Sequence, residues 1–141
     1  MLKHLFVSTL FLVPGLACAQ DGLSVTVDIK DIKNTNGQVY CALFNNSDGF
    51  PGEKKAFKEQ WLPATIGMVK CRFDGLSSGE YAVYVLHDEN GNKSMDSNFV
   101  GAPTEDVAVS NNVRPTFRAP TFEEAKFSLT EDKYLSLEMD H

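Results

Sequence analysis

Apolar and polar side chains alternate along most of the chain after residue 22, and this period of two is typical of half-buried β-strands. The pattern predicts seven short strands, at residues 23–30, 38–44, 66–73, 80–87, 107–109, 125–129 and 135–139. Turn-forming residues such as Asn36-Gly37 separate them. Seven short strands with turns between them favour an all-β fold, a single Greek-key β-sandwich of the Ig-like kind.

Residues 80–87 are apolar on both faces, as expected of a strand at the centre of a sheet. Leu76, Gly79 and Tyr81 have the spacing of a tyrosine corner. In that motif the phenol hydroxyl bonds upstream backbone where the chain crosses between two sheets. The motif predicts the fold and carries no information about activity.

Residues 45–65 interrupt the strand pattern and are longer than a usual connection. Within them, residues 54–61 are expected to form two turns of helix, ended by Pro63. Phe50 and Phe57 add more apolar surface than a simple loop needs. Two interpretations stay open: a flap that covers one end of the core, or a surface for a ligand or partner.

The first 19 residues have the organisation of a secretory signal peptide. Lys3 supplies positive charge, an apolar run follows, and Ala17-Cys18-Ala19 fits the cleavage rule for small residues. We therefore expect residues 1–19 to be a signal peptide and residues 20–141 to be the β-sandwich domain. Acylation of Cys18 is the alternative, although Gly15 stands where a lipoprotein signal requires a large aliphatic residue. No stretch approaches the ~20 apolar residues of a transmembrane helix.

The charge balance argues against nucleic acid as a partner. The sequence has 13 Lys and Arg against 19 Asp and Glu, a net charge of −6. Removal of residues 1–19 takes away one lysine and no acid, which leaves −7. A negative chain without a dense basic cluster repels phosphate backbones.

Export also changes how the cysteines are interpreted. Cys41 and Cys71 remain after cleavage, and each shares a strand face with apolar neighbours. We predict a disulfide between them, formed in an oxidising compartment, which makes the expected location secreted or periplasmic. Two buried free thiols are the alternative.

Oxygen-bearing side chains stand at alternate positions after the central strand. Asp88, Asn90, Asn92 and Asp96 occupy positions 1, 3, 5 and 9 of an EF-hand-like loop, and Ser94 occupies position 7, which donates a carbonyl. A later carboxylate, Glu105 or Asp106, can complete the shell of six to eight oxygens that Ca²⁺ requires.

Two residues depart from that loop pattern: Lys93 replaces the glycine of position 6, and Phe99 replaces the bidentate glutamate of position 12. We expect weak, structural calcium binding, in the range of about 10⁻⁴–10⁻³ M. The alternative is a solvated loop in which Asn90-Gly91 makes the turn and no metal binds.

Histidines are few, and His87 and His141 are the two beyond the signal peptide. His87 ends a strand beside two acids, an arrangement that a zinc or catalytic site could use. A structural histidine is the favoured interpretation, because no second histidine is near in sequence. There is no Gly-x-Ser-x-Gly motif and no exposed free cysteine to act as a nucleophile.

An ordered set of motifs runs through the chain: Gly37-x-Val39-x-x-Ala42-Leu43-Phe44, Leu76-x-x-Gly79-x-Tyr81, His87-Asp88-Glu89-Asn90, Gly101-x-Pro103-x-Glu105, Ser110-Asn111-Asn112 and Pro120-x-Phe122-Glu123. Together they resemble the bacterial exported-protein family called domain of unknown function 2141. The resemblance implies a sandwich related to transthyretin-like and carboxypeptidase-regulatory-like modules, with no established activity. Lys93 departs from the glycine typical of that family. We also expect residues 110–112 to pack against the loop at 88–98.

These observations favour an exported, non-enzymatic binding or accessory module of the bacterial cell envelope. Its expected working surface is the end that carries the loops at 45–65, 88–98 and 101–120, and its partner is an envelope protein or a small ligand. The alternative from another class is a metal-dependent enzyme that uses His87, Asp88 and Asp96.

Overall fold

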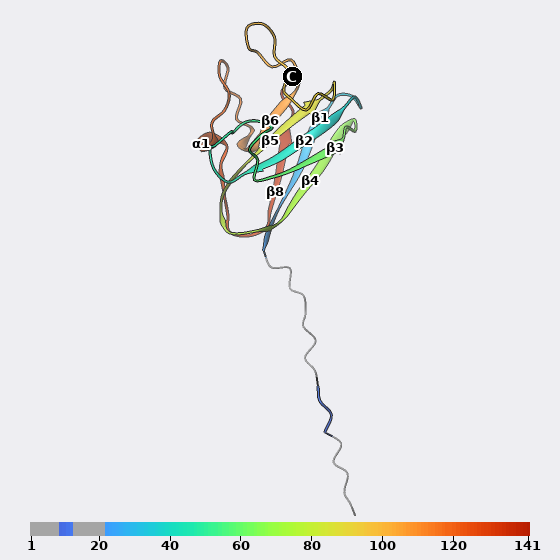
Figure 1. Cartoon of the computed structure of the whole chain (residues 1–141), viewed down its shortest axis with the longest axis vertical. Coiled ribbons are helices and arrows are strands. Elements are labelled where there is room, and N and C mark those ends of the chain that lie inside the picture. The colour runs from blue at the N-terminus through green and yellow to red at the C-terminus, as the bar shows by residue number, and fades with distance from the viewer. Residues whose placement is uncertain (1–8, 13–21) are drawn as a thin grey trace, which may run out of the picture.

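The computed structural model describes residues 9–12 and 22–141, and the latter form two β-sheets (Figure 1). One sheet has the strand order β4-β1-β8 and the other β3-β2-β5-β6, with β7 also paired to β5. The strands are β1 (Leu23–Ile32), β2 (Gln38–Phe44), β3 (Lys58–Pro63), β4 (Gly67–Leu76), β5 (Gly79–Asp88), β6 (Val107–Val109), β7 (Phe127–Leu129) and β8 (Lys133–Glu138). Two short helices, η1 (Ser110–Asn112) and α1 (Phe122–Ala125), complete the elements.

The predicted all-β sandwich is confirmed, because the inward faces of the two sheets share one apolar core. β1 contributes Val25, Val27 and Ile29 to this core, which meet Val83 and Val85 of β5 in the same cluster. The alternation along β1 leaves every second side chain for the outer face. The pattern of apolar residues therefore predicted which side of β1 faces the core between the sheets.

A disulfide joins Cys41 of β2 to Cys71 of β4 and so ties one sheet to the other, as predicted. Both cysteines are buried within the core between the sheets. The bond closes a loop with a sequence separation of 30 residues. In the chain-entropy model such a cross-link destabilises the unfolded chain by about 3–4 kcal/mol.

A second apolar cluster covers the outer face of the larger sheet. Tyr40 and Phe44 of β2 and Tyr84 of β5 pack there against Phe122 of α1. β2 and β5 are consequently buried on both faces, in agreement with the two-sided apolar pattern of residues 80–87. Helix α1 begins with a capping box between Thr121 and Glu124. This Thr-x-x-Glu spacing is a sequence signal for the start of a helix, and the alternation pattern of strands does not include it.

The helix predicted at residues 54–61 is wrong. Lys58–Pro63 instead forms β3, an antiparallel partner of β2 at the edge of the larger sheet. Trp61 thereby stacks against Tyr40, with ring centroids 4.5 Å apart. As a strand, this segment forms backbone hydrogen bonds with β2 and places Trp61 against Tyr40. A two-turn helix would make neither contact, so tertiary contacts override the local helix propensity.

The tyrosine corner predicted at the β4–β5 crossover is present. Tyr81 donates its hydroxyl to the carbonyl oxygen of Ser77 at 2.8 Å. The ring is almost fully buried and belongs to the core between the sheets. This hydrogen bond holds the crossover from the smaller sheet to the larger one.

The predicted signal peptide lies outside the described residues except for residues 9–12, which have no regular secondary structure and are exposed. Within the described ranges, no helix is long and apolar enough to cross a membrane. The disulfide agrees with folding outside the cytoplasm.

Replacing Tyr81 with Phe should lower the free energy of unfolding by about 1 kcal/mol, because it removes one hydrogen bond and keeps the buried ring. Urea denaturation of the oxidised protein measures the effect. Tyr134→Phe is the matched control, since Tyr134 lies exposed on β8. Equal stability of the Tyr81→Phe and Tyr134→Phe proteins would contradict a stabilising role for the corner.

Candidate functional site

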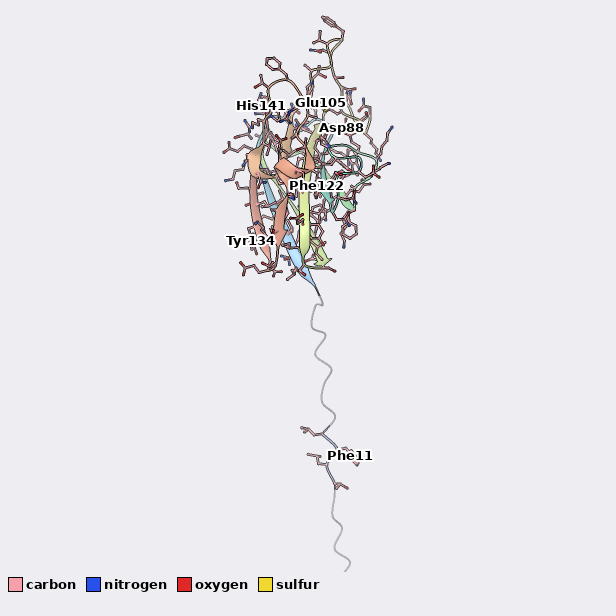
Figure 2. All side chains as sticks on the ribbon, turned by 90° about the vertical axis from the view of Figure 1, so that its left-hand side faces the viewer. Phe11, Asp88, Glu105, Phe122, Tyr134 and His141 are labelled. Atoms are coloured by element: carbon pink, nitrogen blue, oxygen red, sulfur yellow. A yellow bond between two sulfur atoms is a disulfide. The ribbon has the colours of Figure 1, made fainter. Side chains whose placement is uncertain are left out.

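The loops at 88–106 and the C-terminal residues meet at one end of the sandwich. Asp88, Glu105 and His141 lie together at this end, while Tyr134 of β8 lies toward the opposite end (Figure 2). β5 ends at Asp88, and the isolated bridge between Val107 and Asp140 brings the C-terminal segment beside the start of β6. The site is therefore assembled from segments that are distant in sequence.

The 88–96 loop is folded by side chains that accept hydrogen bonds from its own backbone. Asp88 Oδ2 accepts from the backbone N–H of Lys93 at 2.8 Å, a bond from position 1 to position 6 of the predicted calcium loop. Lys93 has φ 59°, the left-handed conformation that glycine usually supplies at that position. The lysine therefore does not abolish the sharp turn, although it bears the strain of adopting it.

The two asparagines of the loop contribute both their oxygens and their amides. Asn90 Oδ1 accepts from the N–H of Asn92 at 3.1 Å, and Asn92 Oδ1 accepts from the N–H of Ser94 at 3.0 Å. Both asparagine amides donate to the carboxylate of Asp96. Alternate oxygens thus line one side of the loop, and the Asp96 carboxylate lies beside them.

Glu105 closes the loop from a separate segment. Its carboxylate accepts from the N–H of Glu89 at 3.1 Å and from the N–H of Asp96 at 3.2 Å. Burial raises the pKa of Glu105, and the charges of Asp96 and Asp88 raise it further, against the opposing effect of the two N–H donors. The carboxylates of Asp96 and Asp88 therefore lie close enough to Glu105 to destabilise its ionised form.

One oxygen of this group has no partner. Asp88 is completely buried, and its Oδ1 forms no hydrogen bond while Oδ2 is turned into the loop by Lys93. A buried carboxylate oxygen without a donor is costly unless a cation or a proton is near it. The predicted residues Asp88, Asn90, Asn92, Asp96 and Glu105 are thus brought together, and Ser94 contacts them through its N–H.

His87 lies on the opposite side of the sheet from Asp88, because successive side chains of a strand alternate. Its ring is fully buried, and Nε2 lies 2.8 Å from the carbonyl oxygen of Asn36. The hydrogen bonds of Asp96 are with Asn90, Asn92, Thr104 and Glu105. His87 therefore has other hydrogen-bond partners than Asp88 and Asp96, and the enzymatic alternative that uses these three residues stays a prediction.

A groove of about 670 Å³ lies between the loops at the same end of the molecule. Residues 51–53 form one part of its lining, and further parts come from residues 100–109 and 112–120. Met95 of the 88–96 loop also borders it. The three loop regions expected to form a working surface thus contribute to one concave feature.

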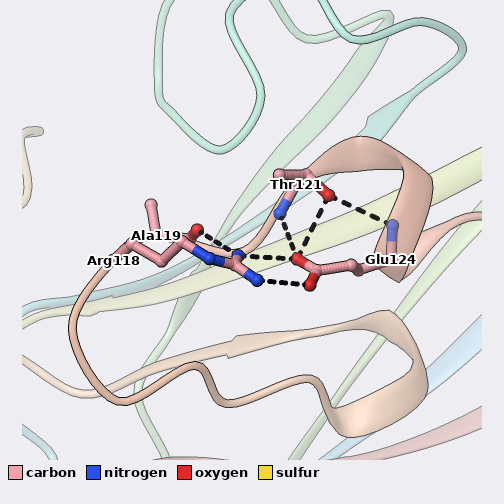
Figure 3. A network of polar contacts seen from close by, with 4 residues as sticks. All are labelled: Arg118, Ala119, Thr121 and Glu124. Atoms are coloured by element: carbon pink, nitrogen blue, oxygen red, sulfur yellow. Dashed lines mark hydrogen bonds and ion pairs between the residues drawn. The ribbon is translucent and has the colours of Figure 1, made fainter.

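Arg118, which lines the groove, belongs to a polar network at the start of α1 (Figure 3). Arg118 donates to both oxygens of Glu124, at 2.6 and 2.9 Å, in a bidentate pair. The same glutamate accepts from the N–H of Thr121 at 2.9 Å as part of the capping box. The hydrogen bond from Arg118, together with the Thr121 N–H, lowers the pKa of Glu124 to about 2.

Residues 110–112 do not make the contacts with the 88–98 loop that the sequence suggested. Ser110 donates its hydroxyl to the carbonyl of Ala125 and accepts from the N–H of Val83. Asn111 donates to the carbonyls of Glu124 and Lys126, and Asn112 bonds to Ser136 and Glu138. β6 pairs Val109 with Tyr84, which places the following residues beside the middle of β5 and away from its end at Asp88.

Sequence patterns did not identify the aromatic tips beside the groove. Phe99 and Phe117 are completely or almost completely exposed, in segments without regular strand alternation. Folding normally buries a phenylalanine ring. A Phe in a loop, flanked by polar or small residues, was therefore the sequence feature that could have indicated an exposed aromatic side chain.

The carboxyl resonance of Glu124 should titrate with a midpoint of about 2. In Arg118→Gln the midpoint should move toward the ordinary value of 4.5, because the bidentate donor is lost while Thr121 remains. The lowered pKa means that this contribution to stability is complete above pH 4.5 and is lost as pH falls toward 2. NMR titration measures both midpoints, and an unchanged midpoint in Arg118→Gln would contradict the assigned cause.

No curated protein and no solved structure matches this sequence significantly. One family model does match, over residues 27–136, which span the described strands from β1 to β8. Its description is "Uncharacterized protein conserved in bacteria (DUF2141)", and the chain belongs to this family.

Proposed function

We propose that the protein is an exported, non-enzymatic binding or accessory module of the bacterial cell envelope, and that the groove at the loop end is its binding surface. The observation that carries the proposal is the convergence of three separate loop regions on this groove. Loops that a rigid β-scaffold holds around a concave surface are a common way to build a binding site. The disulfide and the predicted signal peptide support a secreted or periplasmic location.

Exposed apolar side chains at the groove favour a protein or ligand with an apolar contact surface. Val100 and Phe117 line the groove and are exposed by 72% and 98%. Phe99, the neighbour of Val100, is fully exposed. Large apolar side chains grouped on a surface mark sites of association more often than isolated ones do.

The groove proposal predicts that Phe117→Ser and Phe99→Ser weaken capture of a partner or ligand at least tenfold, because they remove the exposed anchors. Binding is measured by affinity capture from envelope extract of the producing bacterium, followed by titration of the captured molecule. Tyr134→Ser is the matched control, an exposed aromatic toward the other end of the sandwich. Equal binding by all three variants would contradict the location, and catalytic turnover by the pure protein would contradict a non-enzymatic role.

The same proposal includes a structural calcium ion in the 88–96 loop. The side-chain oxygens of Asp88, Asn90, Asn92, Asp96 and Glu105, with the carbonyl of Ser94, supply the number of hard donors that Ca²⁺ takes. The unpartnered Oδ1 of Asp88 and the raised pKa of Glu105, caused first by burial and then by the nearby charges of Asp96 and Asp88, support a cation there. Its role would be to stiffen the loop that borders the groove at Met95.

Calcium at ten times its Kd should raise the free energy of unfolding by about 1.4 kcal/mol relative to chelator, and millimolar Ca²⁺ is the concentration expected to suffice. Thermal melting with and without chelator measures this gain. Asp88→Asn and Glu105→Gln should abolish it, while Glu131→Gln, an exposed acid between β7 and β8, should retain it. An unchanged melting temperature of the unaltered protein at millimolar Ca²⁺ would mean that the loop stands without metal.

A further inference from the structure

The buried imidazole of His87 has one ring nitrogen whose lone pair is unused. Nε2 lies 2.8 Å from the carbonyl oxygen of Asn36, which only accepts hydrogen bonds, so Nε2 carries the hydrogen. Nδ1 is buried and has no hydrogen-bond partner. A ring that donates one N–H to a backbone carbonyl and leaves the other nitrogen free is oriented as metal-binding histidines are.

Two carboxylates face this free nitrogen. One oxygen each from Glu89 and Asp106 and a ring nitrogen of His87 lie within 4.8 Å of one another. Glu89 Oε1 is 3.9 Å from His87 Nδ1 and also accepts from the amide of Asn34. Two carboxylate oxygens close to each other repel one another unless a positively charged group lies near them.

The fold brings these groups together through backbone pairing. His87 and Glu89 are two residues apart at the end of β5, so their side chains fall on the same face. The N–H of His87 donates to the carbonyl of Asp106 at 2.9 Å, which fixes Asp106 beside the ring. The N–H of Asp140 donates to the carbonyl of Val107 at 2.8 Å, and this bond places the C-terminal residue next to Asp106.

His141 then contacts the second carboxylate. Its Nδ1 lies 2.7 Å from Asp106 Oδ2, and the ring is partly exposed. A ligating carboxylate is commonly held by such an outer contact, which sets its orientation. His141 is accordingly a positioning residue for Asp106 and lies at the solvent-facing side of the group.

We propose that His87 Nδ1, Glu89 and Asp106, with His141 behind Asp106, form a binding site for a divalent transition-metal ion such as Zn²⁺. This site is separate from the calcium loop of the proposed function, and it lies on the other side of β5. One imidazole nitrogen with two carboxylates is a donor set for Zn²⁺, Cu²⁺ or Ni²⁺. Ca²⁺ prefers a shell of oxygens alone.

The geometry requires only a small closing of the side chains. Donor atoms that are each about 2 Å from one tetrahedral zinc ion are about 3.3 Å apart. His87 Nδ1 and Glu89 Oε1 are 3.9 Å apart, so a shift of less than about 1 Å brings this pair to that separation. Glu89 is 39% exposed and can move toward the ring, so a metal ion can enter from the solvent on that side.

Zinc binding is tested on the purified oxidised protein in the presence of millimolar Ca²⁺, by competition with a chromophoric chelator. We expect one Zn²⁺ per chain. Glu89→Gln and Asp106→Asn should each weaken the affinity at least tenfold, and His141→Ala should weaken it less than Asp106→Asn. Glu131→Gln is the matched acidic control and Asp96→Asn is the control for the calcium loop, and both should bind zinc as the unaltered protein does.

Two spectroscopic measurements distinguish the site from histidine binding in general. Co²⁺ should give the intense visible absorption of a four-coordinate site with the unaltered protein and not with Glu89→Gln. In ¹⁵N NMR, the Nδ1 resonance of His87 should shift on addition of Zn²⁺ to the unaltered protein, and the shift should be lost in Glu89→Gln.

The proposal would be overturned by the absence of stoichiometric zinc binding or by an unchanged affinity in both carboxylate variants. Loss of binding in His141→Ala alone would also overturn it, since it would identify a terminal histidine as the binding group. Failure of zinc binding with calcium stabilisation intact would leave the proposed function standing.

Discussion

The antiparallel pairing of β2 with β5 is the contact on which the rest of the structure depends. Seven residue pairs join the two strands, from Gln38 opposite Asp88 to Phe44 opposite Ala82. Both strands are buried on both faces, so each supports the core between the sheets and the aromatic cluster outside. The disulfide attaches this central pair to β4 of the smaller sheet. The loops at the end of β5 therefore extend from a strand pair that is joined to both sheets.

The alternation of side chains at the end of β5 divides the polar groups between two environments. His87 lies opposite Val39, whose side chain belongs to the core between the sheets. Asp88 follows on the other face and orders the 88–96 loop through Lys93. The segment before β6 is divided in the same way, since Glu105 bonds to the loop and Asp106 faces His87. One backbone ladder thus keeps two groups of carboxylates apart.

Much of this arrangement could be predicted because it depends on neighbours within a strand. The buried face of β1 follows from alternation, the tyrosine corner from the spacing of Leu76, Gly79 and Tyr81, and the Cys41–Cys71 pair from two cysteines that each share a strand face with apolar neighbours. Glu105 was an expected partner of the 88–96 loop. The grouping of His87 with Asp106 and His141 depends on the pairing of β5 with β6 and on the bond from Asp140 to Val107. Such long-range contacts leave no local pattern. β3 was missed for a related reason, since its conformation is decided by the edge of β2 and not by its own residues.

The carboxylates at the loop end of the sandwich differ in their surroundings from other acids of this negatively charged chain. Some acids elsewhere are paired on the surface, as Glu124 is with Arg118 and Glu123 with Lys126. Asp88 has no such cation, yet it is fully buried. Placing an unpaired charge under a sheet end is unfavourable for folding alone, because burial penalises the ionised form. In the proposed function, a Ca²⁺ ion in the 88–96 loop would compensate the charge of Asp88 and hold the loop that borders the groove at Met95.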